Sequence, residues 1–593
     1  MHVVATAGHV DHGKSALLRA LTGMEPDRWA EERRRGMTLD LGFVWTRLPG
    51  AGDIAFVDVP GHERLVGNML AGVGPVPAVL FVVAADQGWQ PQSEEHLCVL
   101  DALGVRHGVL AVTRRDLAAP DAARAGALAR IARSSLGDVP SVAVSAVTGA
   151  GLDALRAALV RMTGGLPAPD LTADVRLWVD RAFTVRGHGT VVTGTLGAGT
   201  VRVGDRLRLA RDGRTLRVRG LECLKEQCQE AGAVARVAVN VTGPGAADLR
   251  RGDALLTPDR WLITGVTDVR LRGDAARDLP RDLTLHAGSA AVPVTVRPLG
   301  TDTARLRLAA PLPLRVGDGA LLRDPGLHRV PAGVTVLDVR PPRLARRGAA
   351  AARARELGAV AEHADGAGEL RRRGLIHRSE LLAMGVRPPV EPVAGEWLAD
   401  PAHWAALRER LAEAVEEYAV RNPLEPGMPL EAARRTLALP DRGLVDALRA
   451  HCPALRYRDG RLYGSHGGPT LPPAAEAAVA AVRADLARAP FHAPDAGRLR
   501  ELGLTPQLLA AAEAAGTLLR IGPGIVLLPD ADVRAAAVLA RLAQPFTTSQ
   551  ARRALDTTRR VAVPLLEHLD RHGHTVRVDA ALRRCPAPGP DGR

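Results

Sequence analysis

A glycine-rich run near the start of the chain reads Gly8-His9-Val10-Asp11-His12-Gly13-Lys14-Ser15. It fits the spacing G-x-x-x-x-G-K-[ST] of a P-loop, whose backbone N–H groups surround phosphate oxygens. Residues 2–6 predict a strand before the loop, and residues 15–21 predict a helix after it. The run therefore predicts an α/β nucleotide-binding domain. Lys14 would reach the β- and γ-phosphates, and Ser15 would offer its hydroxyl to Mg²⁺.

Lysine usage supports this interpretation. Lysine and arginine together number 78 in 593 residues, yet the only lysines are Lys14 and Lys225. An ammonium group is a compact point charge that the planar guanidinium replaces poorly in a phosphate-binding loop. A chain that otherwise uses arginine has a lysine at position 14, and this favours a P-loop over a chance glycine-rich turn.

A second motif, Asp58-Val59-Pro60-Gly61-His62, follows the predicted strand at 53–57. Asp58 at a strand end can hold the water shell of Mg²⁺, and Gly61 allows the backbone to approach the γ-phosphate. His62 is then placed to orient the attacking water. Upstream, Thr38 would close on Mg²⁺ when the γ-phosphate is present.

The choice of base is predicted from two further motifs. Thr113-Arg114-Arg115-Asp116 follows the apolar run at 109–112, and Asp116 can accept hydrogen bonds from guanine N1 and N2. Arg114 can stack on the base as a planar cation. Ser145-Ala146 follows the predicted strand at 142–144 and would offer a backbone N–H. Together the motifs predict GTP and Mg²⁺ as cofactors.

These motifs resemble those of translational GTPases, elongation factor Tu and its relatives. The resemblance implies that His62 activates GTP hydrolysis on the ribosome and that Asp11 helps to arrange the site. One departure concerns the family's Asn-Lys-x-Asp motif, which is Thr113-Arg114-Arg115-Asp116 here. Thr113 is a shorter hydrogen-bonding side chain, so we expect guanine selectivity to depend on Asp116.

Composition is that of a large globular protein with several cores. Hydrophobic residues make up 46% of the chain, and the five cysteines are too scattered to predict a zinc site. The absence of a signal peptide or a long apolar run predicts a cytoplasmic protein without a membrane partner. The net charge of +13 favours polyanionic partners.

The domain organisation is predicted from changes in pattern along the chain. The GTP-binding domain should span 1–170, with a proline-containing linker at its end. Short strands with glycine turns predict one β-barrel at 174–258 and another at 262–342. These stretches resemble the second and third domains of elongation factor Tu-like GTPases, which implies that they take part in binding aminoacyl-tRNA.

From 343 to 593 the pattern is mainly helical, and it predicts three or four tandem winged-helix modules. The last module should lie at about 531–585, with helices at 533–542, 548–555 and 558–572 and a wing at 575–578. Its third helix begins with residues suited to RNA phosphates or base edges, and the wing adds another. These candidate RNA contacts are Thr558, Arg559, Arg560 and Arg577.

The combined order of domains resembles the bacterial selenocysteine-specific elongation factors. The resemblance implies a protein, expected to be a monomer, that delivers selenocysteinyl-tRNA to the ribosome at recoded UGA codons while bound to an mRNA hairpin. Asp180, Arg181 and Arg236 match the family's selenocysteine pocket, where fixed cations would favour an ionised selenol. His188 is a nearby candidate for the pocket histidine.

The sequence is also compatible with two other functions and with another role for two of the pocket residues. A tRNA carrier resembling the γ subunit of the archaeal and eukaryotic initiation factor would share residues 1–340 but would not need winged helices. A GTP-binding nucleic-acid regulator without turnover is less consistent with Thr38, Asp58 and His62. At the pocket, Asp180 and Arg181 could form an ordinary surface ion pair.

Overall fold

The computed structural model describes residues 1–26, 41–59, 76–185, 189–327, 329–425, 427–464 and 471–586. Thr38, Gly61, His62 and His188 lie outside these ranges. The chain divides into two compact units, residues 1–372 with 376–389 and residues 373–375 with 390–593.

The first unit begins with a six-stranded sheet in the order β2-β3-β1-β4-β5-β6. All neighbouring strands are parallel except the pair β2–β3. The central strand β4 is buried along its whole length, as expected for an apolar run covered on both faces. The strands are β1 His2–Ala7, β2 Gly42–Leu48, β3 Gly52–Asp58, β4 Ala78–Ala84, β5 His107–Thr113 and β6 Ser141–Ala143.

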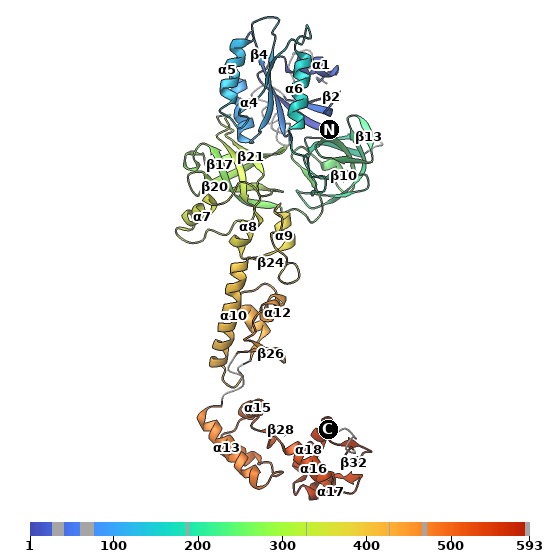
Figure 1. Cartoon of the computed structure of the whole chain (residues 1–593), viewed down its shortest axis with the longest axis vertical. Helices are drawn as coiled ribbons and strands as arrows, with labels where there is room; N and C mark the ends of the chain where they lie inside the picture. Colours follow the sequence, from blue (N-terminus) through green and yellow to red (C-terminus); the bar gives the residue numbers. More distant parts are fainter. Residues whose placement is uncertain are drawn as a thin grey trace. The chain divides into compact units, whose positions relative to one another are not determined.

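Helices cover both faces of this sheet (Figure 1). Helices α1 (Lys14–Thr22) and α6 (Leu152–Gly164) pack on one face through a cluster that includes Leu17 and Leu155. Helices α4 (Pro91–Ala102) and α5 (Asp121–Ile131) pack on the other through a separate cluster. This is a three-layer α/β domain, in which loops at the carboxyl edge of the sheet are available to bind a ligand.

The first β-rich stretch closes into a ring. Strands pair in the order β11-β16-β7-β9-β15-β12, β12 pairs back to β11, and β8 and β13 attach at the side. Buried and exposed residues alternate along β12, which places one face in the barrel core. The main strands are β7 Arg176–Trp178, β8 Arg181–Val185, β9 Gly189–Leu196, β11 Arg206–Leu209, β12 Thr215–Cys223, β13 Glu226–Cys228, β15 Ala235–Thr242 and β16 Ala254–Leu256.

The second β-rich stretch is a closed barrel in the order β17-β20-β19-β18-β21-β22. It lies against the GTP-binding domain, where Gly333 of β22 contacts helix α4 so closely that a Cβ would be 2.4 Å from the Ala102 carbonyl oxygen. Its strands are β17 Thr264–Gly273, β18 Asp282–Ala287, β19 Ala290–Pro298, β20 Thr303–Leu312, β21 Gly319–Arg323 and β22 Ala332–Asp338.

Helix α7 (Ala349–Gly358) is fixed to the second barrel by a buried arginine. Arg353 is 4% exposed, and it donates to Asp268 Oδ2 at 2.7 Å and Asp338 Oδ2 at 2.5 Å. Arg305 of β20 also donates to both oxygens of Asp268. The first unit therefore continues beyond its barrels, through α7 and α8 (Gly366–Arg373, to residue 372) to α9 (Arg378–Ala383). Strand β23 (Leu375–His377) begins in the second unit and ends in the first.

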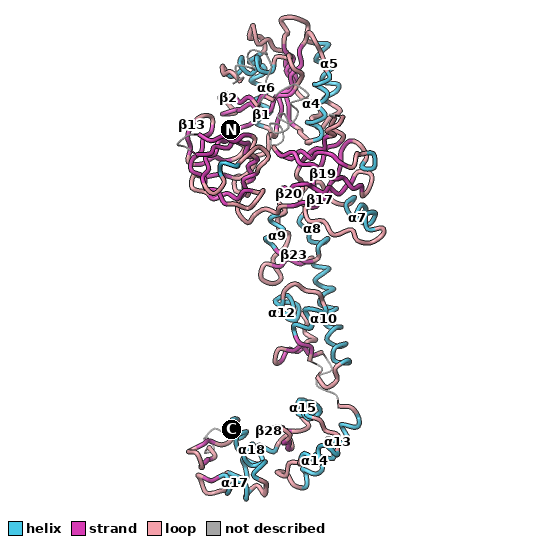
Figure 2. The backbone as a smooth tube through the Cα atoms, turned by 180° about the vertical axis from the view of Figure 1, so that it is seen from behind, coloured by secondary structure: helices cyan, strands magenta, loops and turns pink. Residues whose placement is uncertain are grey.

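The second unit repeats one arrangement three times within its described part: three helices followed by a two-stranded antiparallel wing (Figure 2). We call these the first, second and last modules of the unit. The first has α10 Pro401–Arg421, α11 Leu430–Thr436, α12 Arg442–Ala450, β26 Arg456–Arg458 and β27 Arg461–Tyr463. The second has α13 Pro473–Arg488, α14 Ala496–Glu501, α15 Pro506–Ala514, β28 Leu519–Gly522 and β29 Ile525–Leu527. The last has α16 Ala531–Leu539, α17 Thr548–Ala554, α18 Arg559–Arg571, β31 Val576–Arg577 and β32 Leu582–Arg584.

The second and last modules share one hydrophobic core, which runs from Leu471 to Leu569. Strand β28 of the second module packs against α18 of the last. Arg560 Nη2 donates to the carbonyls of Ala493 (3.0 Å) and Pro494 (2.8 Å), and the Thr557 hydroxyl donates to the Phe491 carbonyl. The two modules therefore form one body.

The elements predicted around the nucleotide motifs and in the last module are confirmed, with ends shifted by a few residues. The predicted wing at 575–578 contains β31, and the predicted helix at 558–572 contains α18. Within the described residues, no helix combines the length and apolar character needed to cross a membrane.

Candidate GTP-binding site

The predicted nucleotide motifs meet at one edge of the first sheet. The P-loop follows β1, Asp58 ends β3, Thr113 ends β5, and Ser145 follows β6. Because these strands are parallel, their carboxyl ends lie on the same side of the domain. The structure thus brings together motifs that are more than 100 residues apart in sequence.

The P-loop conformation depends on Gly8. Its φ is +130°, and a Cβ at this position would lie 2.1 Å from the Val82 carbonyl oxygen of β4. Side chains of α4 hold the loop from the other side. The Gly8 N–H donates to His96 Nδ1 and the Val10 N–H to Gln92 Oε1, both at 3.0 Å. Sequence analysis missed both side chains, because neither belongs to a nucleotide motif.

Two buried histidines next to the loop are held neutral. Burial lowers the pKa of His96 to about 3, and the Lys14 charge adds to the effect. Burial also lowers the pKa of His12 to about 4, partly offset by its contact with the Val82 carbonyl at 3.3 Å. His96 must be unprotonated at Nδ1 to accept from Gly8, so its lowered pKa and its hydrogen bond agree.

Lys14 lies inside the loop with 7% of its surface exposed. Its ammonium donates to the carbonyls of Gly8 at 3.0 Å and His9 at 2.9 Å. Burial lowers its pKa, and the nearby carboxylates of Asp58 and Asp11 act in the opposite direction. A cation in this loop is suited to phosphate oxygens, which are stronger acceptors than carbonyls.

Oxygen atoms suitable for Mg²⁺ meet where β3 ends. Asp58 is fully buried, and its Oδ2 accepts from the Ser15 hydroxyl at 2.8 Å. Its Oδ1 accepts from Thr6 Oγ1 at 2.8 Å, which fixes the carboxylate. Mg²⁺ prefers carboxylate, hydroxyl and water oxygens, and the Ser15–Asp58 pair supplies the first two. The donor set and the narrow cradle at Gly8 therefore fit a magnesium nucleotide.

The end of β5 is tied to the P-loop. The Thr113 hydroxyl donates to the His12 carbonyl at 2.7 Å, so the shorter side chain still reaches the loop. Arg114 donates to the Asp11 carbonyl and forms an ion pair with Asp86 at 2.9 Å. These contacts hold Arg114 against the loop, a role that differs from the predicted stacking on the base.

The predicted base-binding residues lie beside this point. Asp116 is exposed, which leaves its carboxylate accessible. Ser145 is buried, and its hydroxyl accepts from the N–H groups of Val147 and Thr148. Ala146, the next residue, is half-buried. Thr38, Gly61 and His62 lie outside the described residues, so their roles remain predictions from sequence.

The predicted selenocysteine-pocket residues lie in the first barrel, next to the GTP-binding domain. Arg236 forms a two-pronged ion pair with Asp180, with Nη2 3.0 Å from Oδ1 and Nη1 contacting Oδ2. Both side chains are buried, and Thr193 also donates to Asp180 at 2.7 Å. Asp180 therefore pairs with Arg236 inside the protein, which differs from the surface pair with Arg181 considered above.

Aromatic side chains of β2 lie beside two cations of the first barrel, Arg236 and Lys225. The Arg236 guanidinium lies 5.4 Å from the Phe43 ring centroid, and the Lys225 ammonium lies 5.4 Å from that of Trp45. Arg181 donates to the Leu41 carbonyl at 3.4 Å. The predicted pocket residues therefore lie where the first barrel contacts the GTP-binding domain near β2, the strand that follows Thr38 in the sequence.

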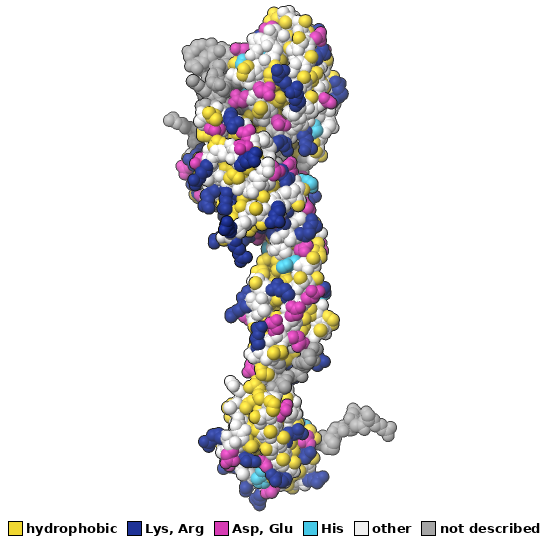
Figure 3. Space-filling view, turned by 90° about the vertical axis from the view of Figure 1, so that its left-hand side faces the viewer, with side chains coloured by type: hydrophobic (Ala, Val, Ile, Leu, Met, Phe, Trp, Pro, Cys, Tyr) yellow, Lys and Arg dark blue, Asp and Glu magenta, His cyan; other side chains and the backbone are white. Residues whose placement is uncertain are grey.

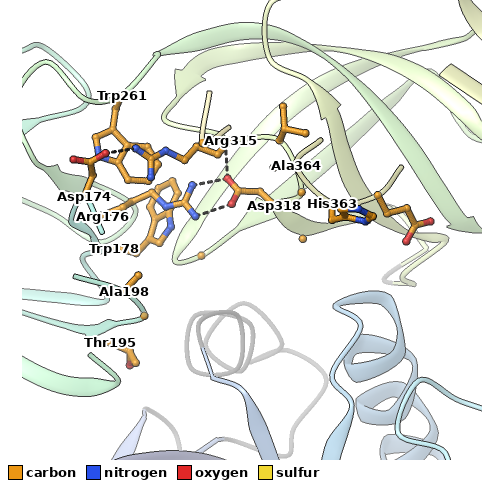
Figure 4. A pocket seen from close by; sticks show the side chains of 17 residues that line it. Asp174, Arg176, Trp178, Thr195, Ala198, Trp261, Arg315, Asp318, His363 and Ala364 are labelled. Carbon is orange, nitrogen blue, oxygen red and sulfur yellow. Dashed lines mark hydrogen bonds and ion pairs between the residues drawn. The ribbon is translucent and has the colours of Figure 1, made fainter. Parts of the chain in front are cut away.

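A separate cavity of about 590 Å³ lies between the two barrels (Figure 4). Two ion pairs cross it. Arg176 donates to the Asp318 carboxylate through Nη1 and Nη2, and Arg315 binds Asp174 at 2.9 Å. The Arg315 guanidinium stacks 3.5 Å from the Trp261 ring centroid. Each arginine is thus paired with a carboxylate of the other barrel region, and the two ion pairs join the barrels at the cavity wall.

The predicted RNA-contacting residues of the last module have different surroundings. Arg559 is exposed, and its side chain has no hydrogen-bond or ion-pair partner in the described part of the chain. Arg560 binds carbonyls of the second module, as described above, and Arg577 donates to the carbonyls of Asp579 and Ala580 in its own wing. Thr558 is the exposed N-cap residue of α18.

Three segments of the chain match known families. Residues 1–164 match the elongation factor Tu GTP binding domain, and residues 189–256 match elongation factor Tu domain 2. Residues 537–581 match the winged helix of elongation factor SelB. With the closed second barrel, these matches confirm the predicted multidomain fold class.

Curated relatives give the same result over part of the chain. It is 38% identical over 338 residues to the selenocysteine-specific elongation factor of Desulfomicrobium baculatum, covering 54% of this chain and 53% of the relative. It is 37% identical over 353 residues to that of Escherichia coli K12, covering 58% and 56%. Translation initiation factor 2 subunit gamma of Thermococcus kodakarensis is 31% identical over 241 residues, covering 35% and 58%. The chain thus aligns with about half the length of the curated relatives it matches.

A crystal structure of a bacterial selenocysteine-specific elongation factor, EF-Sec, has the same fold. It superposes with a TM-score of 0.74 at 24% identity, covering 99% of this chain and all of the other. These findings confirm the predicted resemblance to selenocysteine-specific elongation factors.

Proposed function

We propose that this chain is a GTP-hydrolysing translation factor that binds selenocysteinyl-tRNA and delivers it to the ribosome at recoded UGA codons. Its winged-helix modules would bind a hairpin in the message. One observation carries the proposal: a single chain contains an elongation factor Tu GTP-binding domain, its second domain and a SelB winged helix, in that order. We further propose that it acts as a monomer in the cytoplasm.

The nucleotide is proposed to be GTP with Mg²⁺. Backbone N–H groups of the P-loop, with Lys14, would hold the phosphates, and Asp116 with the Ser145-Ala146 backbone would select guanine. Ser15, Asp58 and Thr38 would hold the metal, which neutralises phosphate charge when bound. The 2.8 Å contact between Ser15 and Asp58 supports this assignment, because it places two metal-seeking oxygens together.

His62, next to Gly61, is proposed to orient the water that attacks GTP. Replacing it by alanine should leave GTP affinity nearly unchanged and slow ribosome-stimulated hydrolysis by about 10²-fold or more. Lys14→Ala should instead abolish GTP binding, which separates catalysis from binding. Near-normal stimulated hydrolysis by His62→Ala would contradict the assignment.

Amino-acid selection is proposed to involve Asp180, Arg181 and Arg236. Guanidiniums held at fixed positions would favour an ionised selenol over a neutral hydroxyl. In the last module, Thr558, Arg559, Arg560 and Arg577 are proposed to face the message hairpin, with Arg559 as the main free contact.

Capture of tRNA tests the whole proposal. The chain is incubated with total bacterial tRNA, aminoacylated under conditions that preserve selenocysteine, and with either GTP or GDP. Bound tRNA is then sequenced. GTP-dependent enrichment of the selenocysteine tRNA supports the proposal. Enrichment of initiator tRNA would favour the initiation-factor γ alternative, and no retained tRNA would favour a nucleic-acid-binding regulator.

A further inference from the structure

Net charge alone does not identify an RNA-binding surface on this chain. Basic and acidic side chains are interspersed over the face drawn in Figure 3. The three wings of the second unit differ in what their side chains contact. Each wing is a two-stranded hairpin of similar size, so the differences lie mainly in the side chains.

The wing of the second module is used for packing. Ile521 and the three residues of β29 are buried, and β28 packs against α18 of the last module. Arg520 forms an ion pair with Glu513 at 2.9 Å. This wing has little free surface for another molecule.

The wing of the last module is partly engaged. Arg583 is 7% exposed and paired with Asp570 at 2.8 Å, and Arg577 binds carbonyls of its own turn. Two of its arginines thus already have acceptors within the module.

The wing of the first module differs from both. All three residues of β26 are exposed: Arg456, Tyr457 and Arg458. The side chain of Arg456 has no partner in the described part of the chain, and Arg458 meets only the neighbouring Asp459, at 3.2 Å with both side chains about 80% exposed. A pair so exposed contributes little to stability, so Arg458 remains available to another anion.

Strand register places three arginines on one face of this wing. Side chains alternate along a strand, so Arg456 and Arg458 share a face, and Arg461 lies directly opposite Arg458. Arg461 is already engaged, because it donates to the Gly427 carbonyl at 2.9 Å and pairs with Glu425 at 3.5 Å. This face of the wing therefore presents Arg456 and Arg458 to a polyanion, with Arg461 held beside them.

The other face of the wing adds an aromatic ring. Tyr457 is opposite the buried Leu462, yet 43% of its surface is exposed. The Arg449 guanidinium from α12 lies 4.2 Å from its ring centroid. A tyrosine already stacked with a guanidinium offers a flat surface at the wing's edge, and single-stranded RNA binds such surfaces through its bases.

We propose that the wing of the first module, residues 456–461, is a second RNA-binding surface, which contacts single-stranded message next to the hairpin. Arg456 and Arg458 bind two phosphates of the strand, and Tyr457 stacks on one unpaired base. The inference rests on the proposed function, because it assumes that the second unit is the part that binds the message.

The test uses the full-length chain and fluorescence anisotropy across a series of salt concentrations. The probes are an RNA hairpin with single-stranded tails, the same hairpin without tails, and tRNA. The double variant Arg456→Ala, Arg458→Ala should weaken binding of the tailed hairpin and lower its salt slope by about 1.4, the value for two single-strand phosphates. Binding of the tailless hairpin should change little.

A matched control removes the same charge elsewhere in the first module. Arg421→Ala with Arg435→Ala deletes two exposed arginines, each paired to a glutamate on its own helix. This variant should keep the salt slope of the parent. Equal changes in slope for both double variants would overturn the inference, because the effect would then come from net charge.

Tyr457 provides an independent readout. Tyr457→Ala should weaken binding of the tailed hairpin by about fivefold or more, while Tyr457→Phe keeps the ring and the affinity. Parent-like binding by Tyr457→Ala, or a loss seen only with tRNA, would contradict the inference. If the parent chain bound no RNA at all, the proposed function would fail with it. If the parent chain bound RNA and no variant of this wing weakened that binding, only this inference would be overturned.

Discussion

At the scale of single residues, buried polar groups in this protein depend on partners that lie far away in sequence. Asp180 and Arg236 are 56 positions apart and form a buried pair. Removing one partner of such a pair leaves an uncompensated charge in the protein interior, which is more costly than removing both. The proposed pocket must therefore be tested with variants that separate folding from selection.

We predict that Arg236→Ala destabilises the first unit by about 3–5 kcal/mol, because Asp180 then stays buried without its cation. The double variant Asp180→Asn with Arg236→Gln should lose much less, since two neutral amides can bond to each other. Thermal unfolding of parent, single and double variants measures the difference. Equal losses for the single and double variants would show that the unpaired Asp180 charge is not what destabilises Arg236→Ala.

Arg181 gives a cleaner test of selection, because it is not part of the Asp180–Arg236 pair. Arg181→Ala should weaken selenocysteinyl-tRNA binding about ten- to a hundredfold, the scale of a lost charge-assisted contact, and leave seryl-tRNA binding unchanged. Filter binding with both tRNAs measures this. Equal losses for both would assign Arg181 to the tRNA body or the barrel.

His96 predicts a pH dependence of the GTP-binding domain. Its pKa is about 3 in the folded protein, against 6.5 for an unperturbed histidine. The unfolded state therefore binds more protons below pH 6.5, and stability is lost as the pH falls from there toward the folded-state pKa. Asparagine could still accept from Gly8 without titrating. When the pH is lowered from about 7 to about 5, the melting temperature of His96→Asn should therefore fall less than that of the parent. An identical pH profile would exclude His96 as a source of acid sensitivity.

At the scale of elements, local patterns were predictable and long-range pairings were not. Strands at the nucleotide motifs and helices of the last module follow from apolar periodicity and capping residues. By contrast, nothing in the alanine- and arginine-rich sequence of α7 indicates that Arg353 is buried, and its contacts with Asp268 and Asp338 of the second barrel explain this burial. Adjacent residues of an extended chain point to opposite sides, so Asp180 was more suited to a distant partner than to Arg181.

The joint core of the second and last modules predicts cooperative behaviour. A fragment of residues 471–593 should unfold in one transition and bind hairpin RNA without GTP or tRNA, and its affinity should fall steeply with salt. A fragment beginning at Asp530 should be far less stable, because it loses half of the shared core. Two separate transitions in the longer fragment would contradict a single body.

Within that fragment, two neighbouring arginines should behave differently. Arg559→Ala should cost about 1–3 kcal/mol of RNA binding if it contacts a base, without changing the melting temperature. Arg560→Ala should lower the melting temperature, because it loses its bonds to the second module. Tighter binding of duplex DNA than of any hairpin RNA tested would instead favour a DNA-binding regulator.

At the scale of the whole molecule, the boundary between the two units decides where the chain can be cut. Residues 376–389 belong to the first unit, and α7 supplies the cation for two buried carboxylates. Truncation after Pro389 should spare GTP and tRNA binding and abolish UGA recoding in a reporter assay. A cut before Arg353 should destabilise the second barrel, because Asp338 and Asp268 both lose their Arg353 contact, while Asp268 keeps its contact with Arg305. Recoding that survives the truncation after Pro389 would show that message binding is not needed.

The scarcity of lysine has a consequence for chemical labelling. An amine-acylating reagent can modify only Lys14, Lys225 and the chain's N-terminal amine. Lys225 is exposed and should react quickly, whereas Lys14 is 7% exposed within the P-loop. A nucleotide in the loop would shield Lys14 further and leave the other two amines as internal standards. Mass spectrometry of the acylated chain would therefore report how much of the protein carries nucleotide, without a label on the nucleotide or an engineered probe.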